Sequence, residues 1–289
     1  MDAVEFWSAN QPGFELARSK QGTPEFYAEV DEQRYAREPH VPEIARFGDW
    51  GGRDVLDVGC GIATDGVRFA RAGARYVGID ASPAAVELAR RRLELEGLDG
   101  TIVAGSATEL PFPDSSFDLV WSHGVIHHIE GTATAVDEFH RVLRPGGIAL
   151  VMLYYKRSFN YAVTIMGVRR LLAASLLLPG AVPAVARLTR EDEAVLEGHR
   201  QLLRTHGLAY LRDGQLFLSH NTDRPGNPLS KVYSRTEAED LFHRFATVTT
   251  AVRYLNLRLY PGGPAFERTS LGRALGRRFG WHLYIRATK

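Results

Sequence analysis

The most informative chemical pattern in the sequence is a pair of glycines within the run Asp57-Val58-Gly59-Cys60-Gly61. Because glycine has no side chain, the backbone N–H groups of such a turn can approach a ligand closely. A dinucleotide-binding turn would carry a third glycine three positions after Gly61, where this chain has Thr64. The Asp57 carboxylate would also repel a pyrophosphate, whereas it suits a ligand with positive charge. The pattern therefore favours a cationic ligand over a dinucleotide.

A second acid, Asp80, follows the glycines by about twenty residues, at the end of a predicted strand. A carboxylate at this place can accept hydrogen bonds from both hydroxyls of a ribose. The alternative is that Asp80 only helps to start the helix that follows Ser82. We predict the ribose role.

Three histidines gather in the segment Trp121–His128, after another predicted strand. Histidine readily accepts a proton near neutral pH, so His123 could act as general base for an acceptor hydroxyl or amine. The alternative is that His123 only walls the ligand pocket. We expect His127 and His128 mainly to shape the loop, although His128 and Tyr154 remain catalytic candidates. We predict no metal, because no nearby carboxylate has convincing ligand spacing.

Alternating strands and helices must position these residues. The first half predicts strands over 54–59, 75–81, 101–105, 117–122 and 148–154, with helices over 64–72, from Pro83 to Gly97, and ending near 144–147. Ser82 is a suitable N-cap for the second helix. Such alternation implies a parallel sheet covered on both faces, and ligands bind at the carboxyl ends of its strands.

The alternation stops after Tyr155 and resumes at Ser234, whose spacing to Glu237 predicts a capping box. Strands are predicted over 247–257 and 281–287. We therefore divide the chain into an N-terminal cap (1–50), a core (51–155), a helical insertion or lid (156–233) and a C-terminal completion of the sheet (234–289).

Four motifs in order resemble the S-adenosylmethionine (SAM) binding motifs of class I methyltransferases. They are V-L-D-V-G-C-G from Val55, G-I-D-A-S from Gly78, G-S-A-T-E-L-P-F-P-D-S-S-F-D-L-V from Gly105 and H-R-V-L-R-P-G-G from His140. The closest likeness is to the group that includes the ubiquinone and menaquinone biosynthesis methyltransferases. The resemblance covers roughly residues 50–155.

This resemblance implies an α/β fold with a seven-stranded Rossmann-like sheet, mostly parallel with the last strand antiparallel, a helical N-terminal cap and a large helical insertion after the fifth strand. It also implies SAM as cofactor and S-adenosylhomocysteine as product. By position, the methionine end of SAM would contact Asp57, Gly59, Cys60 and Gly61. The other predicted cofactor contacts are Asp80 at the ribose, Ala81 beside the adenine, and Ser106, Ala107 and His123. Many relatives have aspartate where this chain has Ser106.

The acceptor is harder to predict. The apolar stretch 161–188 is interrupted by Arg169, Arg170, Gly180 and Pro183, so we expect a lid or an interfacial helix and no membrane span. This stretch favours a partly apolar small-molecule acceptor. The loop 221–228 is either an ordinary loop or a polar rim that orients the substrate.

The bulk properties narrow the function further. A net charge of +1 on 289 residues argues against nucleic acid as a partner. The single cysteine and the absence of signal-peptide character in the first five residues indicate a cytoplasmic protein. We expect a monomer or a homodimer, between which the sequence does not decide. We predict in-line methyl transfer from SAM to O, N or C of an acceptor. The alternatives are a SAM-binding protein without methyl transfer and, less favoured, an NAD(P)-dependent oxidoreductase.

Overall fold

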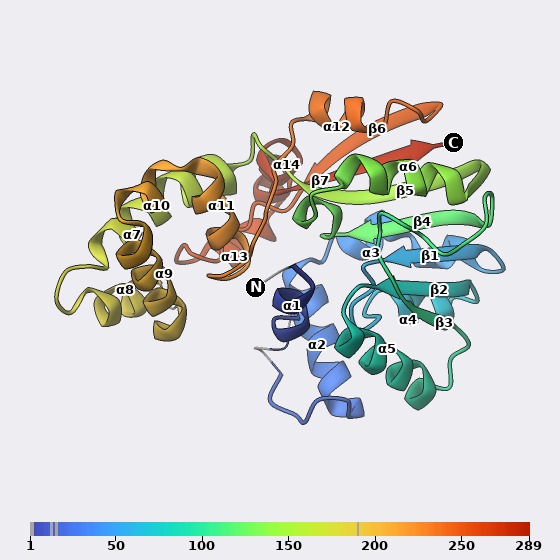
Figure 1. The fold of residues 1–289 in the computed structure, drawn as a ribbon, viewed down its shortest axis with the longest axis horizontal. Helices are drawn as coiled ribbons and strands as arrows, with labels where there is room; N and C mark the ends of the chain where they lie inside the picture. Colours follow the sequence, from blue (N-terminus) through green and yellow to red (C-terminus); the bar gives the residue numbers. More distant parts are fainter. Residues whose placement is uncertain (1–2, 12–13, 15–16, 190) are drawn as a thin grey trace.

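A seven-stranded sheet forms the centre of the computed structural model, which describes residues 3–11, 14, 17–189 and 191–289. The sheet order is β3-β2-β1-β4-β5-β7-β6, with β1 to β5 parallel and β7 antiparallel to both of its neighbours. The predicted fold class is therefore confirmed (Figure 1). The strands are β1 (Asp54–Val58), β2 (Arg75–Asp80), β3 (Thr101–Ala104), β4 (Phe117–His123), β5 (Leu143–Tyr154), β6 (Thr247–Arg253) and β7 (His282–Thr288).

Both faces of the sheet are buried, as the apolar character of the central strands requires. On β1, Val55 packs into one apolar cluster with α4 (Gly66–Arg71) and α5 (Pro83–Glu96). The adjacent Leu56 packs into a second cluster with α6 (Thr132–Val142) and α12 (Arg235–Leu241). Neighbouring residues point to opposite faces because side chains alternate along a strand. The short elements α3 (Val41–Ala45), η2 (Phe47–Trp50), η3 (Ile126–His128), α13 (Gly263–Glu267) and α14 (Ser270–Phe279) complete this part of the chain.

The predicted caps are present. The Ser82 side chain accepts a hydrogen bond from the Ala85 amide at 3.2 Å, and Ser234 forms a capping box with Glu237. The strand predicted over 247–257 is shorter, because Tyr254 and Asn256 have φ of 65° and 59°, which no strand accommodates. Strand β5 begins earlier than predicted, at Leu143, where it pairs with β4.

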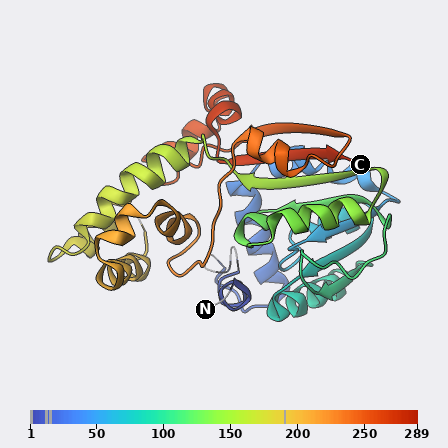
Figure 2. The ribbon, with the colours of Figure 1, turned by 45° about the horizontal axis from the view of Figure 1, so that its top comes forward.

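The segment between β5 and β6 holds the helices η4 (Asn160–Arg169, a π-helix), α7 (Arg170–Ser175), α8 (Ala181–Thr189), α9 (Glu193–His206), α10 (Leu208–Arg212) and α11 (Gly214–Thr222). Figure 2 shows η4 and α7 following one another away from the sheet, with the remaining helices packed beneath them. The chain returns along β5 through a parallel bridge between Tyr155 and Tyr233. None of the described helices has the length and apolar character to cross a membrane.

Two N-terminal helices, α1 (Ala3–Ala9) and α2 (Pro24–Arg37), lie between the sheet and the insertion (Figure 1). The Thr23 hydroxyl caps α2 by accepting from the Phe26 amide at 3.3 Å. Residues 1 and 2, part of the segment tested above for a signal peptide, lie outside the described residues. The N-terminal helices bring a second layer of side chains to the carboxyl ends of the parallel strands.

Candidate active site

A cavity of about 420 Å³ lies at the carboxyl ends of β1, β2 and β4, under α1 and α2. Its size is typical of small-molecule sites. Every residue that the sequence analysis named as a cofactor or catalytic candidate lines it. These are Asp57, Gly59, Cys60, Gly61, Asp80, Ala81, Ser106, Ala107, His123, His128 and Tyr154. The fold therefore brings the predicted residues together, although which of them contact a ligand stays a prediction.

The glycine turn is held tightly against β2. The amides of Gly59 and Cys60 donate to the Ile79 carbonyl at 2.8 and 3.1 Å. Gly59 has φ of 75°, and a Cβ atom there would lie 2.2 Å from Val125 Cγ2. Glycine is therefore required at position 59 for both conformation and space. The backbone of residues 59–61 lines the cavity, and we call this turn the glycine cradle.

Two backbone amides hold the Asp80 carboxylate, one in the glycine cradle and one at the start of α5. One carboxylate oxygen accepts from the Gly61 amide at 2.8 Å and the other from the Ser82 amide at 2.8 Å. Burial raises the pKa of Asp80, and the amides of Ser82 and Gly61 oppose that shift. Its contact with Ser82 supports the helix start, as the structural alternative requires, while the ribose role of Asp80 stays a prediction.

Negative charge is concentrated at the floor of the cavity. Burial, followed by repulsion from Asp65, raises the pKa of Asp57 well above its usual value. The Tyr76 hydroxyl donates to Asp57 at 3.1 Å and partly opposes that shift. Asp65, which the sequence analysis did not identify, also lines the cavity. Three carboxylates around a glycine cradle fit a ligand that carries ammonium and sulfonium charges better than one that carries phosphates.

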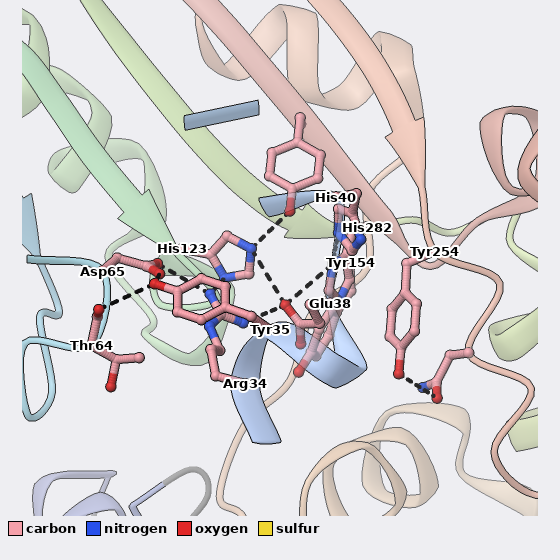
Figure 3. A network of polar contacts seen from close by, with 12 residues as sticks. Arg34, Tyr35, Glu38, His40, Thr64, Asp65, His123, Tyr154, Tyr254 and His282 are labelled. Carbon is pink, nitrogen blue, oxygen red and sulfur yellow. Dashed lines mark hydrogen bonds and ion pairs between the residues drawn. The ribbon is translucent and has the colours of Figure 1, made fainter. Parts of the chain in front are cut away.

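His123 is fixed through both ring nitrogens (Figure 3). An Arg34 nitrogen lies 3.1 Å from its Nδ1, and the Tyr284 hydroxyl lies 2.8 Å from its Nε2. Since a guanidinium can only donate, Nδ1 accepts and Nε2 carries the proton of the neutral ring. Burial, followed by the positive charge of Arg34, lowers the pKa of His123 well below its usual value. These contacts favour the interpretation in which His123 walls the pocket.

One possible set of metal ligands exists among the described residues, formed by Glu38, His123 and His282. A Glu38 carboxylate oxygen lies 3.7 Å from His123 Nε2 and 3.9 Å from His282 Nδ1. However, Arg34 pairs with that same Glu38 oxygen and donates to His123. A ligating histidine normally donates its second N–H to an acceptor, and here that position faces a donor. The donor set therefore does not fit a metal.

In the neutral ring of His128 the other nitrogen, Nδ1, carries the proton. Its Nδ1 lies 2.9 Å from the Leu229 carbonyl oxygen, which can only accept, so Nδ1 carries the proton and Nε2 has the lone pair. That Nε2 lies 3.5 Å from a carboxylate oxygen of Asp223. The Tyr154 hydroxyl donates to the other Asp223 oxygen at 3.0 Å, and Asn227 donates to the first at 3.1 Å. A side chain from the insertion thus joins Tyr154 of β5 and His128 of η3.

Sequence reasoning missed four residues of this site: Arg34, Glu38, Asp65 and Asp223. Asp223 lies in the loop considered above as a polar rim, and it lines the cavity. Arg34 and Glu38 belong to the end of α2, whose charged residues resemble any solvated helix in the sequence. Only the packing of α2 over the strand ends distinguishes them.

Comparisons with known proteins identify relatives of this chain. Residues 56–151 match the methyltransferase domain family. The chain is 39% identical to the 27-O-demethylrifamycin SV methyltransferase of Amycolatopsis mediterranei, over 33% of this chain and 36% of that protein. It is 26% identical to the ubiquinone biosynthesis O-methyltransferase of Brucella anthropi, over 72% and 75% of the two chains.

Among solved structures, a SAM-dependent methyltransferase of Thermotoga maritima superposes with a TM-score of 0.50 at 18% identity, over 91% of this chain and 97% of that one. The core of the chain is therefore a class I methyltransferase domain, of the family that uses SAM as cofactor. The chain covers only 36% of the length of the rifamycin methyltransferase.

Proposed function

We propose that the protein transfers the methyl group of SAM to an oxygen or nitrogen of a small, partly apolar acceptor. The observation that carries this proposal is the contact between His128 Nε2 and an Asp223 carboxylate oxygen, 3.5 Å apart, in the same cavity as the glycine cradle. SAM would be held by Asp57, Gly61 and Asp80. The relatives named for rifamycin and ubiquinone biosynthesis support a small-molecule acceptor.

In this mechanism the acceptor O–H or N–H donates to His128 Nε2. The acceptor lone pair attacks the SAM methyl carbon, the bond between carbon and sulfur breaks, and its electrons stay on sulfur as the thioether of S-adenosylhomocysteine. The acceptor proton moves to His128, where Asp223 stabilises the imidazolium. Alignment of the two reactants supplies most of the acceleration, and the base adds roughly 100- to 10,000-fold.

The acceptor would bind between α1 and the loop of Asp223. Trp7 of α1 packs against His128 with ring centroids 4.9 Å apart, and Ser8 donates to Ser82 at 2.9 Å. Helix α1 thus contacts both the cofactor half and the acceptor half of the cavity. We propose that α1 and segment 156–233 together exclude water from the reacting atoms, and that the protein acts in the cytoplasm as a monomer or homodimer.

Transfer of a labelled methyl group from SAM to catechol, a hydroxybenzoate and a set of larger phenols tests this function. We expect His128→Asn, whose amide can still donate to Leu229, to bind SAM normally and to lose methyl transfer by roughly 100- to 10,000-fold. His243→Asn, at an exposed histidine, is the matched control. SAM binding without transfer to any acceptor would favour the non-methylating alternative, and equal rates for wild type and His128→Asn would exclude this base.

A further inference from the structure

The end of the insertion exposes several large apolar side chains. Leu177 and Leu178, between α7 and α8, are 56% and 62% exposed. Leu171 on α7 and Leu188 on α8 are 76% and 70% exposed. We call these four leucines the apolar tip. Their exposure is not explained by the cavity, because none of the four lines it.

The connection that holds Leu177 and Leu178 lies at an extreme of the molecule, whereas Leu188 lies at the other end of α8. Figure 1 is drawn with the longest axis horizontal, and the connection between α7 and α8 lies at its left end, on the far side of the insertion from the sheet. Helix α8 buries Val182 and Val185 against the insertion while Ala184 and Leu188 remain exposed. Helices α7 and α8 therefore each bury one side within the insertion, and the four leucines lie on their exposed sides and in the connection between them.

Positive charge accompanies this apolar surface. Residues 156–189 contain five basic residues and no acidic one. Lys156 and Arg169 are neutralised by Glu237 and Glu191, whereas Arg187, next to Leu188, is exposed. Further exposed cations, Arg204 and Arg212, lie on the neighbouring helices α9 and α10. The acidic residues of the insertion begin at Glu191, just beyond the end of α8 that carries Arg187 and Leu188, so the excess of positive charge belongs to residues 156–189.

We propose that the apolar tip docks on the surface of a membrane that contains anionic phospholipids. Leucines enter the boundary between headgroups and acyl chains, and nearby arginines are attracted to the lipid phosphates. A convex tip offers little area for a second copy of the chain, which needs a broad complementary patch for a stable dimer. A lipid layer, in contrast, adapts to a narrow protrusion. This contact does not depend on methyl transfer.

Co-sedimentation of the whole protein with vesicles tests the proposal. The vesicles are phosphatidylcholine alone and phosphatidylcholine mixed with phosphatidylglycerol. We expect binding to the mixed vesicles that weakens with added salt. The double change Leu177→Ser with Leu178→Ser, and separately Arg187→Glu, should each weaken it about tenfold or more. Leu95→Ser, at an exposed leucine of α5, is the matched control and should bind like wild type.

Each variant is first shown to bind SAM like wild type, which establishes that it folds. Failure of the wild type to bind mixed vesicles, or binding that the tip variants leave unchanged, would overturn the proposal. Gel filtration tests whether the apolar tip instead joins two copies of this chain. If the tip variants convert a dimer into a monomer and the wild type ignores vesicles, the apolar tip is an interface between copies of this chain. None of these readouts requires an acceptor or a turnover.

Discussion

The amide of Gly61 donates to a carboxylate oxygen of Asp80 at 2.8 Å, which joins the glycine turn after β1 to the end of β2. We predict that Asp80→Ala weakens SAM binding by roughly 100-fold or more, since two ribose hydrogen bonds to a carboxylate each contribute about 1.5–3 kcal/mol. Calorimetric titration with SAM measures the loss. Asp99→Ala, at an exposed aspartate, should bind like wild type, and unchanged binding by Asp80→Ala would remove this residue from the cofactor site.

The two glycines of the turn should respond differently to a methyl group. A Cβ atom at Gly59 would lie 2.2 Å from Val125, whereas one at Gly61 would lie no nearer than 3.5 Å to Gln11. Both have positive φ, so each alanine costs about 1–3 kcal/mol of strain, but only Gly59→Ala adds a clash. We expect Gly59→Ala to lower the melting temperature more than Gly61→Ala.

A second substitution tests the cause of that difference. Adding Val125→Ala to Gly59→Ala removes the clashing methyl groups and should restore part of the melting temperature. No recovery in the double variant would show that the Val125 methyl groups do not cause the loss; Val125 Cβ would still lie 2.9 Å from the added atom.

SAM binding should depend on pH through the buried carboxylates. Burial raises the pKa of both Asp57 and Asp80, so each takes up a proton more easily than an ordinary aspartate. A protonated carboxyl attracts a cation less strongly, and SAM affinity should therefore fall as pH falls below neutral. Binding at mildly acid pH should release protons, which calorimetry in two buffers of different ionisation enthalpy detects.

S-adenosylhomocysteine provides the control for charge, because it keeps the ammonium group and lacks the sulfonium. Its binding should vary less with pH than that of SAM. If the two ligands bind with equal pH dependence, the carboxylates that take up protons do not lie near the ligand sulfur.

The stability of the insertion should also depend on pH. His199 of α9 is buried, its Nδ1 lies 2.7 Å from the Tyr210 hydroxyl, and burial lowers the pKa of His199 to about 3. The unfolded chain, with a histidine pKa near 6.5, binds this proton more readily. Unfolding free energy should therefore decrease by about 1.4 kcal/mol per pH unit for this histidine as pH falls from about 6.5 toward 3.

His199→Gln, which can still bond Tyr210, should flatten this dependence between pH 6 and 4.5 in urea unfolding, by about one proton. His206→Gln, at an exposed position, should leave the slope unchanged. His40 has a similarly lowered pKa, also about 3, so the wild-type slope includes a second contribution that both variants retain.

The core of the fold could be predicted from sequence because local signals agree with each other there. Ser82 caps its helix, Gly97 ends it in the left-handed conformation, and the strands alternate between two buried faces. Gly59 and Asp80 were recognisable because the turn chemistry is local. Asp223 was not recognisable, since its contact with His128 joins residues 95 positions apart through packing of the insertion.

The roles of the histidines could not be ranked from sequence for the same reason. His123 and His128 are five positions apart, but their tautomers are set by Arg34 and by Leu229, which come from distant segments. The nearest sequence neighbours do not determine which ring nitrogen is free. The hydrogen-bond partner of each ring, which comes from a distant segment, determines it.

The segment that follows α11 joins the insertion to the residues around His128. The Lys231 amide donates to the His127 carbonyl at 2.9 Å, two residues from Leu229, which orients His128. If His128 is the base as we propose, exchange of segment 156–233 between relatives would replace the residues that orient this base together with the cover of the acceptor. On that proposal, substrate preference and proton transfer would depend on the same segment of the chain.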